Sequence, residues 1–390
     1  MIQITFGSAS EKRGATPRAA SRGASKAGRI TDLDALDKIG NASINFSTVP
    51  QSGRSSLADI ARLAGVSLAT ASRAMSNAYG VAPSTRARVL RIAEELDYVV
   101  SPEASRLARG AVGRVALVVP HVDRWFFGAV VSGLEAELSD AGMDVLLYHV
   151  GDADDRRDFF HRLPARRKVD AVVVVAFGVA EAEQRRLERM GVLIVAAGGQ
   201  NAVYPSVHID DGEAGRQAMD HLLFLGHRRI GMIAAVDPDE ADRTGTTGRA
   251  DAYFAALRDA GLPVDAGLAV TIDWSGVAAA DAMATLLSRR HPPTAVYCHS
   301  DELALGAVRT IRRAGLRVPE DISVIGIDDH PLAELTDLTT VAQPARDQGV
   351  RTAHLLLALL RGQPTGRHVV VPTRLVIRRS TAPPTPAREG

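Results

Sequence analysis

Residues 56–99 read SLADIARLAGVSLATASRAMSNAYGVAPSTRARVLRIAEELDYV, and the spacing of their apolar and capping residues predicts three short helices. Ser56 can cap the first helix, and Gly65 ends it because glycine readily takes a positive φ. Ser67 can cap a second helix that runs through residues 68–76. Two short helices joined by a brief turn that contains glycine are typical of a helix-turn-helix.

The second of these helices is the candidate for reading DNA. Small hydroxyls can bind phosphates, and an arginine can bond guanine O6 and N7 in the major groove. A third helix is expected from Ser84 to about Asp97. The alternative is a small three-helix bundle that binds nothing, which the many arginines disfavour. The residues expected to form the DNA-binding surface are Leu68, Ala69, Thr70, Ser72 and Arg73, with a wider basic surface from Arg86, Arg88 and Arg91.

Charge is unevenly distributed along the chain. Residues 1–110 hold 15 Lys and Arg against 9 Asp and Glu, whereas residues 111–390 hold 31 against 36. A basic front end on an acidic body indicates a polyanionic partner for the front end alone. A solvated basic tail without a partner would give the same pattern, so charge alone leaves both interpretations open.

From residue 115 onward, continuous apolar runs alternate with amphipathic stretches. Strands without inside–outside alternation are buried on both faces, which predicts parallel sheets covered by helices. About a dozen such elements are too many for one compact open sheet, so two α/β lobes are expected. The clearest runs are VALVVP (115–120), DVLLYHV (144–150), AVVVVA (171–176), VLIVAA (192–197), RIGMIAA (229–235), AVYCHS (295–300) and ISVIGI (322–327).

Polar and aromatic residues follow several of these runs and predict a ligand cleft, because open α/β sheets bind ligands beyond the carboxyl ends of their strands. The only two tryptophans, Trp125 and Trp274, both follow strands, and an indole face can stack on a sugar ring. Arg249 lies among small residues and needs an acceptor. As alternatives, a strand-end Asp can serve only as a helix cap, and Trp274 can pack between lobes. The polar strand-end candidates are Asp123, Asp210, Asp273, Ser300, Asp301 and Asp328.

The motifs of the common enzyme classes are absent from the sequence. It has no G-x-S-x-G elbow and no G-x-x-x-x-G-K loop, and the adjacent Asp328 and Asp329 are not an acid/base pair across a substrate. The single cysteine, Cys298, excludes an intrachain disulfide and a cysteine-based metal site, and His221 and His227 are poorly spaced for a metal. We therefore expect no catalytic residue, no metal and no cofactor. A glycosidase is the alternative from another functional class.

The expected location is the cytoplasm. No apolar run is long enough to span a membrane, and residues 1–30 lack the apolar core of a signal peptide. A single cysteine suits a reducing compartment. An exported sugar-binding protein is the alternative with the same kind of ligand cleft, and the lack of a signal peptide disfavours it.

The front end resembles the N-terminal segment of LacI/GalR (lactose/galactose repressor) family transcriptional regulators. The pattern D-[IV]-A-x-x-A-G-V-S-x-x-T-x-S-R matches residues 59–73, and T-R-x-R-V and L-x-Y follow at 85–89 and 96–98. So many matched positions within one short segment make the resemblance specific. It implies base contacts from Leu68, Ala69 and Arg73 and phosphate contacts from Ser67, Thr70 and Ser72.

A short hinge helix is expected at residues 101–112. Ser101 as N-cap and Pro102 at the first helical position favour it. In the family this segment folds on DNA and inserts a leucine into the minor groove, which kinks the operator. The resemblance places Ala104 and Leu107 at those positions. The Pro-Asn that usually precedes the hinge helix is absent here, so a plain linker is the alternative.

The body resembles periplasmic sugar-binding proteins, up to about residue 381. The resemblance implies an all-α helix-turn-helix DNA-binding domain plus an α/β two-lobed periplasmic-binding-protein-like sensor domain with parallel sheets. The usual Asn-Pro-Phe-Phe after the first strand is Arg124-Trp125-Phe126-Phe127, so Arg124 could meet an anion and Trp125 a second sugar face. The effector residues expected overall are Asp123, Trp125, Phe126, Asp210, Arg249, Trp274, Ser300, Asp301 and Asp328.

The expected organisation is a homodimer, or alternatively a tetramer, that binds a pseudo-palindromic operator and has no membrane partner. A sugar or sugar derivative would close the cleft, displace the hinge helices and relieve repression. The predicted segments are a disordered tail (1–54, which an upstream start codon would explain), the helix-turn-helix (55–100), the hinge (101–112), the sensor (113–382) and a second tail (383–390). Within the sensor we expect lobe 1 at about 113–222 and 346–373, and lobe 2 at about 223–345 and 374–382.

Overall fold

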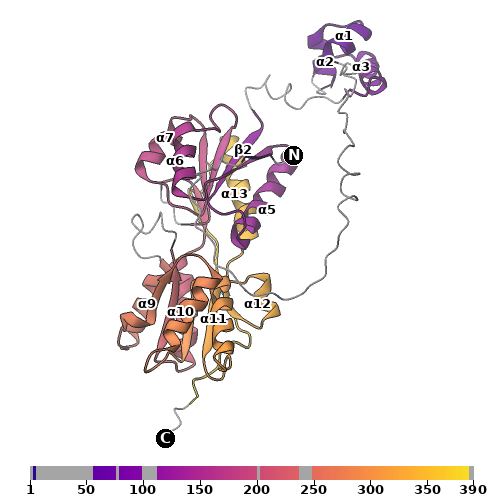
Figure 1. The fold of residues 1–390 in the computed structure, drawn as a ribbon. Coiled ribbons are helices and arrows are strands. Elements are labelled where there is room, and N and C mark those ends of the chain that lie inside the picture. Colours follow the sequence, from indigo (N-terminus) through magenta and orange to yellow (C-terminus); the bar gives the residue numbers. More distant parts are fainter. Residues whose placement is uncertain are drawn as a thin grey trace, which may run out of the picture. The chain divides into compact units, whose positions relative to one another are not determined.

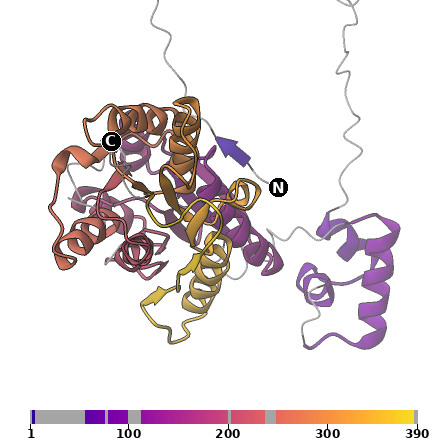
Figure 2. The ribbon, with the colours of Figure 1, turned by 90° about the horizontal axis from the view of Figure 1, so that it is seen from below.

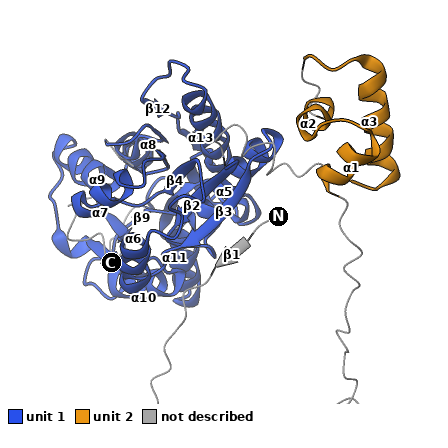
Figure 3. Cartoon of the chain, turned by 90° about the horizontal axis from the view of Figure 1, so that it is seen from above, with its two compact units in different colours: residues 1–7, 112–390 blue, residues 8–111 orange. Residues whose placement is uncertain are grey.

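The computed structural model describes residues 3–5, 56–75, 79–98, 112–199, 203–236 and 248–385. The chain divides into two compact units, residues 8–111 and residues 1–7 with 112–390 (Figure 3). The predicted hinge helix, with Ala104 and Leu107, lies outside the described residues, as does the predicted tail apart from residues 3–5. None of the helices in the described ranges combines the length and apolarity needed to cross a bilayer.

The smaller unit is the predicted trihelical motif, with α1 (Leu57–Leu63), α2 (Leu68–Met75) and α3 (Pro83–Glu95). Ser56 caps α1, because its Oγ accepts a bond from the Asp59 backbone N–H at 3.2 Å. Gly65 follows α1 with φ +63°, as expected for the turn. The third helix begins at Pro83 rather than after a Ser84 cap, because proline already has the φ of a first helical residue. The core of this unit consists of Ile60, Ala61, Ala64, Ala71, Ala74, Val89, Ile92 and Ala93.

The first lobe of the larger unit contains a parallel seven-stranded sheet in the order β1-β3-β2-β4-β5-β6-β12. Its edge strand β1 (Gln3–Thr5) comes from the segment predicted to be a tail. Side chains of β2 alternate between two hydrophobic cores, one shared with α5 and the other with α6 and α7. The elements are β2 (Arg114–Val119), α5 (Trp125–Asp140), β3 (Asp144–His149), α6 (Ala153–Arg162), β4 (Ala171–Val175), α7 (Glu181–Glu188), β5 (Leu193–Ala197), β6 (Ser206–His208), α13 (Ala345–Leu360) and β12 (His368–Val370).

The second lobe contains a six-stranded sheet in the order β13-β11-β10-β9-β7-β8. All neighbours are parallel except β13, which pairs antiparallel with β11 at the edge, as is common in sheets of this kind. The elements are α8 (Asp211–Phe224), β7 (Ile230–Ala235), α9 (Gly248–Asp259), a 3-10 turn (Ala266–Leu268), β8 (Ala269–Ile272), α10 (Gly276–Leu287), β9 (Ala295–Cys298), α11 (Asp301–Arg313), β10 (Ser323–Asp328), α12 (Pro331–Leu335), β11 (Thr339–Ala342) and β13 (Arg374–Val376).

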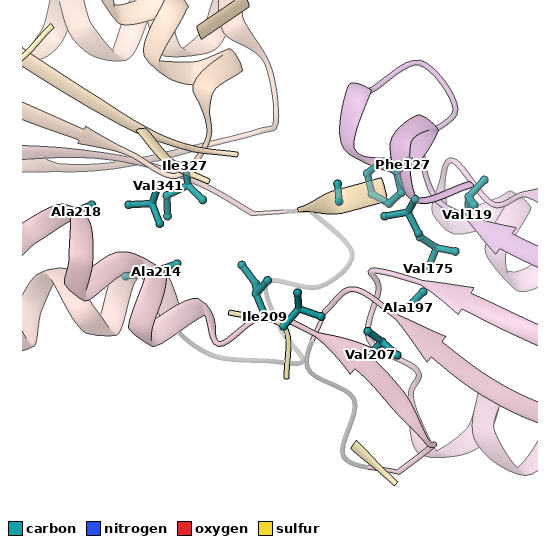
Figure 4. Close-up of a cluster of buried hydrophobic side chains, with 14 of the residues drawn as sticks. Val119, Phe127, Val175, Ala197, Val207, Ile209, Ala214, Ala218, Ile327 and Val341 are labelled. Carbon is teal, nitrogen blue, oxygen red and sulfur yellow. The ribbon is translucent and has the colours of Figure 1, made fainter. Parts of the chain in front are cut away.

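The chain crosses between the lobes three times, at residues 209–210, 343–344 and 371–373 (Figure 1). The predicted first boundary at residue 222 is wrong, because α8 packs against α9 and the second sheet and so belongs to lobe 2. Figure 4 shows Ile209 at this crossing, between buried side chains of the first lobe and those of α8, Ile327 and Val341. The crossing segment thus contributes to a core that reaches into both lobes.

Helices α5 and α13 pack side by side on one face of the first sheet (Figures 1 and 2). A Cβ atom added to Gly133 of α5 would overlap the backbone carbonyl oxygen of Arg346, and one added to Gly349 of α13 would overlap that of Val130. The two glycines therefore permit a close approach of the helix backbones. This packing fixes the start of α13 immediately after the second crossing.

Candidate functional site

A cavity of about 170 Å³ lies between the two lobes, where the carboxyl ends of strands from both sheets face each other. This is the position where open α/β sheets bind ligands. Its walls combine aromatic rings with buried polar groups. The lining residues are Arg124, Phe126, Phe127, Ala176 and Gly199 from lobe 1, Ile209, Asp211, Gln343 and Gln348 at and beside the crossings, and Ala235, Val236, Arg249, Trp274, His299, Ser300 and Asp328 from lobe 2.

Arg249 lies in the first turn of α9, and its guanidinium is almost fully buried. Its Nε donates to Asp211 Oδ1 at 2.7 Å, and its Nη1 donates to the His299 carbonyl oxygen. Burial disfavours the charge, but the carboxylates of Asp211 and Asp328 outweigh it and raise the arginine pKa above its usual value. Arg249 was expected to need a hydrogen-bond acceptor, and that acceptor is Asp211. It is the neighbour of Asp210, which was predicted to bind the effector.

Asp328 ends β10 and is the start of a hydrogen-bonded chain. Gln343 Nε2 donates to Asp328 Oδ1, and Gln348 Nε2 donates to Gln343 Oε1 at 3.2 Å. Burial raises the pKa of Asp328 to about 6, although the charge of Arg249 and the bond from Gln343 oppose this shift. The backbone of Asp328 has φ +134°, a conformation that side-chain-bearing residues rarely adopt. Asp328 is thus held in a strained position at the cavity wall.

Trp274 lines the cavity, but one face of its indole is already covered. The Arg124 guanidinium lies 4.2 Å from the ring centroid, and Arg124 Nε lies 3.6 Å from Glu302 Oε2 of α11. Because Arg124 precedes α5 in lobe 1 and both partners belong to lobe 2, this arginine joins the lobes beside the cavity. The predicted sugar-stacking face of Trp274 is therefore shared with a cation.

His299 follows β9 and is fully buried at the cavity. Burial and the charge of Arg249 lower the pKa of this imidazole to about 3, so the ring is neutral at physiological pH. An interaction with the Ala235 backbone opposes that shift. The other nitrogen, Nε2, has no hydrogen-bond partner among the described residues.

Five predicted effector residues line the cavity, and four do not. Asp210 caps α8 by accepting a bond from the Glu213 N–H at 2.9 Å, and Asp301 is buried in bonds from Thr340 Oγ1 and the His330 N–H. These carboxylates serve the capping and structural roles that the sequence left open as alternatives. The cavity-lining predictions are Phe126, Arg249, Trp274, Ser300 and Asp328.

The other two predicted effector residues that do not line the cavity are Asp123 and Trp125. They lie where the chain enters α5. Asp123 is exposed to solvent. Trp125 is half-buried, stacks on His330 with 5.1 Å between ring centroids, and borders a separate hollow of about 710 Å³. Phe126 follows in the first turn of α5 and lines the cavity. The aromatic residue that lines the cavity is therefore Phe126, the direct neighbour of Trp125, which was predicted to give a second sugar-stacking face.

Sequence reasoning missed Asp211, His299, Gln343 and Gln348. Asp211 and His299 are the direct neighbours of the predicted residues Asp210 and Ser300. Gln343 follows β11, whose carboxyl end was not predicted to bind a ligand. Gln348 gives no such signal, because it lies inside α13 and reaches the cavity only through the packing of that helix on α5.

In the smaller unit, α2 presents the predicted DNA-binding residues at the surface. Ser67 caps this helix by accepting a bond from the Thr70 N–H at 3.1 Å, and the two hydroxyl oxygens lie 2.9 Å apart. Leu68 is more than half exposed, and Arg73, one turn beyond Ala69, is exposed as well. An apolar, a hydroxyl and a guanidinium group on one accessible helix are the side chains that major-groove readout uses.

A DNA-binding-type helical unit and a two-lobed unit with a ligand cavity together define a ligand-responsive regulator. The model for bacterial regulatory proteins of the lacI family matches residues 56–101, and the periplasmic binding protein-like domain model matches residues 219–381. The HTH-type transcriptional repressor CytR of Escherichia coli (strain K12) is 34% identical over 338 residues, which cover 85% of this chain and 97% of that protein.

Solved structures agree with this assignment. The lac repressor dimer bound to operator and the anti-inducer ONPF has a TM-score of 0.75 at 25% identity, covering 84% of this chain and 99% of that one. The transcriptional regulator CelR–cellobiose complex has a TM-score of 0.62 at 31% identity, covering 83% and 99%. The chain belongs to the LacI family. It is a DNA-binding transcriptional regulator and not an enzyme, as the sequence predicted.

Proposed function

We propose that this regulator represses transcription by binding a pseudo-palindromic operator as a homodimer, and that a sugar or sugar derivative bound between the lobes releases it. The observation that carries the effector part is the interlobe cavity with Arg249 buried against Asp211 at its wall. Buried polar groups beside aromatic walls suit a small hydroxylated ligand. Action on operator DNA supports a cytoplasmic location for the protein.

Relatives support both halves of the proposal. The lac repressor structure is described as an operator-bound dimer, and the CelR structure contains cellobiose. In this chain we assign base contacts to Leu68, Ala69 and Arg73 and phosphate contacts to Ser67, Thr70 and Ser72. Ala104 and Leu107 of the hinge are assigned to the minor groove.

The effector half is tested by changing Arg249. An operator selected from a random duplex pool with the full-length protein serves as the DNA, and D-ribose, D-glucose and cellobiose serve as probes. Arg249→Ala removes charge-assisted bonds worth roughly 1.5–3 kcal/mol each, so a probe that binds wild type should bind this variant at least tenfold more weakly. Operator affinity without a probe should stay unchanged.

Arg258→Ala is the matched control, because Arg258 lies exposed on the same helix and does not line the cavity. It should bind probe and operator like wild type. Equal probe affinity in wild type and Arg249→Ala would show that the effector binds elsewhere and would refute the assigned cleft.

A further inference from the structure

The hydrogen-bonded chain from Asp328 fixes the orientation of a buried amide. Gln343 gives its amide N–H to the Asp328 carboxylate, so its oxygen faces Gln348 and accepts the Gln348 N–H. Gln348 is fully buried and lines the cavity. Its own oxygen, Oε1, is left without a hydrogen-bond partner among the described residues. The hydrogen bonds therefore leave a carbonyl acceptor, and not an amino donor, unpaired on this cavity-lining residue.

A second unpaired polar atom belongs to a residue of the same cavity. The Nε2 of His299 is buried and has no hydrogen-bond partner among the described residues. A buried polar atom that remains unpaired is unfavourable, so each of these two atoms favours a ligand that supplies its missing hydrogen-bond partner.

The two arginines of the cavity lie beside carboxylates, although the Arg124 Nε is buried without a hydrogen bond to any described residue. Arg249 is paired with Asp211, and Arg124 lies 3.6 Å from Glu302 while covering Trp274. An ionic ligand would have to displace one of these partners. The cavity therefore favours an uncharged ligand.

We propose that Gln348 is a specificity-determining residue of the cleft, and that the effector is an uncharged molecule that donates an O–H or N–H bond to Gln348 Oε1 and also pairs with His299 Nε2. This rests on the proposed function, because it names the chemistry recognised at the same cleft. Sites built to accept a ligand hydroxyl discriminate strongly against analogues that lack it, since a buried acceptor is then left unpaired. Gln348 would thus select among ligands by the position of their hydroxyl groups. Arg249 would contribute to the affinity for every ligand.

The test is a thermodynamic cycle between Gln348 and the hydroxyls of the ligand. Calorimetry on full-length protein compares D-ribose, D-glucose, cellobiose and uridine with the charged D-gluconate and glucose 6-phosphate. For the uncharged probe that binds, each mono-deoxy analogue is then measured against wild type and Gln348→Leu. One deoxy analogue should bind wild type roughly 10–100-fold more weakly than its parent, yet bind Gln348→Leu within about threefold of it.

Gln217→Leu is the matched control, because Gln217 also has a buried, unpartnered Oε1 but lies on α8 away from the cavity. Its deoxy penalties should equal those of wild type. If Gln348→Leu does not fold, Gln348→Met replaces it; this side chain also lacks the amide oxygen, so the same penalty should be lost.

Two results would overturn the proposal. These are equal penalties at every hydroxyl in wild type and in the Gln348→Leu or Gln348→Met variant, and Arg249-dependent binding of the charged probes alone. Either result leaves the proposed function intact, provided that Arg249→Ala still weakens binding at least tenfold. If no probe of either kind binds in an Arg249-dependent manner, both this inference and the proposed function fail.

Discussion

Asp328 shows how burial controls charge at single residues of the cleft. The carboxyl is enclosed, and its pKa rises from 3.8 to about 6. Between these values the folded protein holds a proton that the unfolded chain has released, so rising pH favours unfolding in this window. Ionisation of Asp328 should therefore lower the free energy of unfolding by on the order of 2–3 kcal/mol between about pH 4 and pH 6.

We predict that Asp328→Asn removes this decrease in the free energy of unfolding with rising pH. Asn keeps an oxygen that can accept the Gln343 bond but has no proton to release. Urea unfolding at pH 4.5 and pH 7, followed by tryptophan fluorescence, measures it, because both tryptophans belong to the sensor unit. The drop in stability from pH 4.5 to pH 7 should be smaller in Asp328→Asn than in wild type and unaltered in Asp347→Asn, a partly exposed control on α13. An identical drop in all three proteins would contradict the account.

Predictions for single residues succeeded where a side chain had one possible role and failed where it had two. A lone Arg249 among small residues demanded an acceptor, and the fold supplies one. A carboxylate at a strand end can line a cavity or cap the next helix, and Asp210 and Asp301 do not line it whereas their neighbours Asp211 and Ser300 do. Adjacent residues at the start of a helix point about 100° apart around its axis. The sequence alone does not tell which of the two faces the cavity.

At the scale of elements, the apolar runs predicted their strands because each is buried on both faces. All seven became strands of the two sheets. The first lobe crossing was misplaced because α8 is amphipathic whichever sheet it covers, so its periodicity gives no information about its lobe. Gln348 was missed for a related reason, since a helical position reveals a cavity only once the helix is packed.

The close approach of α5 and α13 is a feature of elements that can be tested. Gly133→Ala would place a methyl group against the Arg346 carbonyl, so the variant should lose roughly 1–3 kcal/mol of stability from overpacking. Gly128→Ala on the same helix meets nothing within 4 Å and should be neutral or gain up to about 1 kcal/mol. Urea unfolding measures both changes. Equal stabilities of the two variants would show that this helix contact does not require glycine.

At the scale of the whole molecule, a sensor with a cavity and a DNA-binding unit are joined in one chain. Regulation then requires that occupancy of the cavity change the free energy of operator binding. Such coupling is reciprocal and typically amounts to about 1–3 kcal/mol, or a factor of 5–150 in affinity. Burial of Ile209 in a core shared by both lobes gives the larger unit a continuous packing path between them.

The central claim is tested most directly by measuring this coupling in both directions on the full-length protein. Fluorescence anisotropy gives operator affinity with and without a saturating concentration of the probe that binds the cleft, and calorimetry gives probe affinity with and without saturating operator. We predict that probe weakens operator binding and that operator weakens probe binding by the same factor, of about 5 or more. Operator affinity that is unchanged while the probe occupies the cleft would contradict the account.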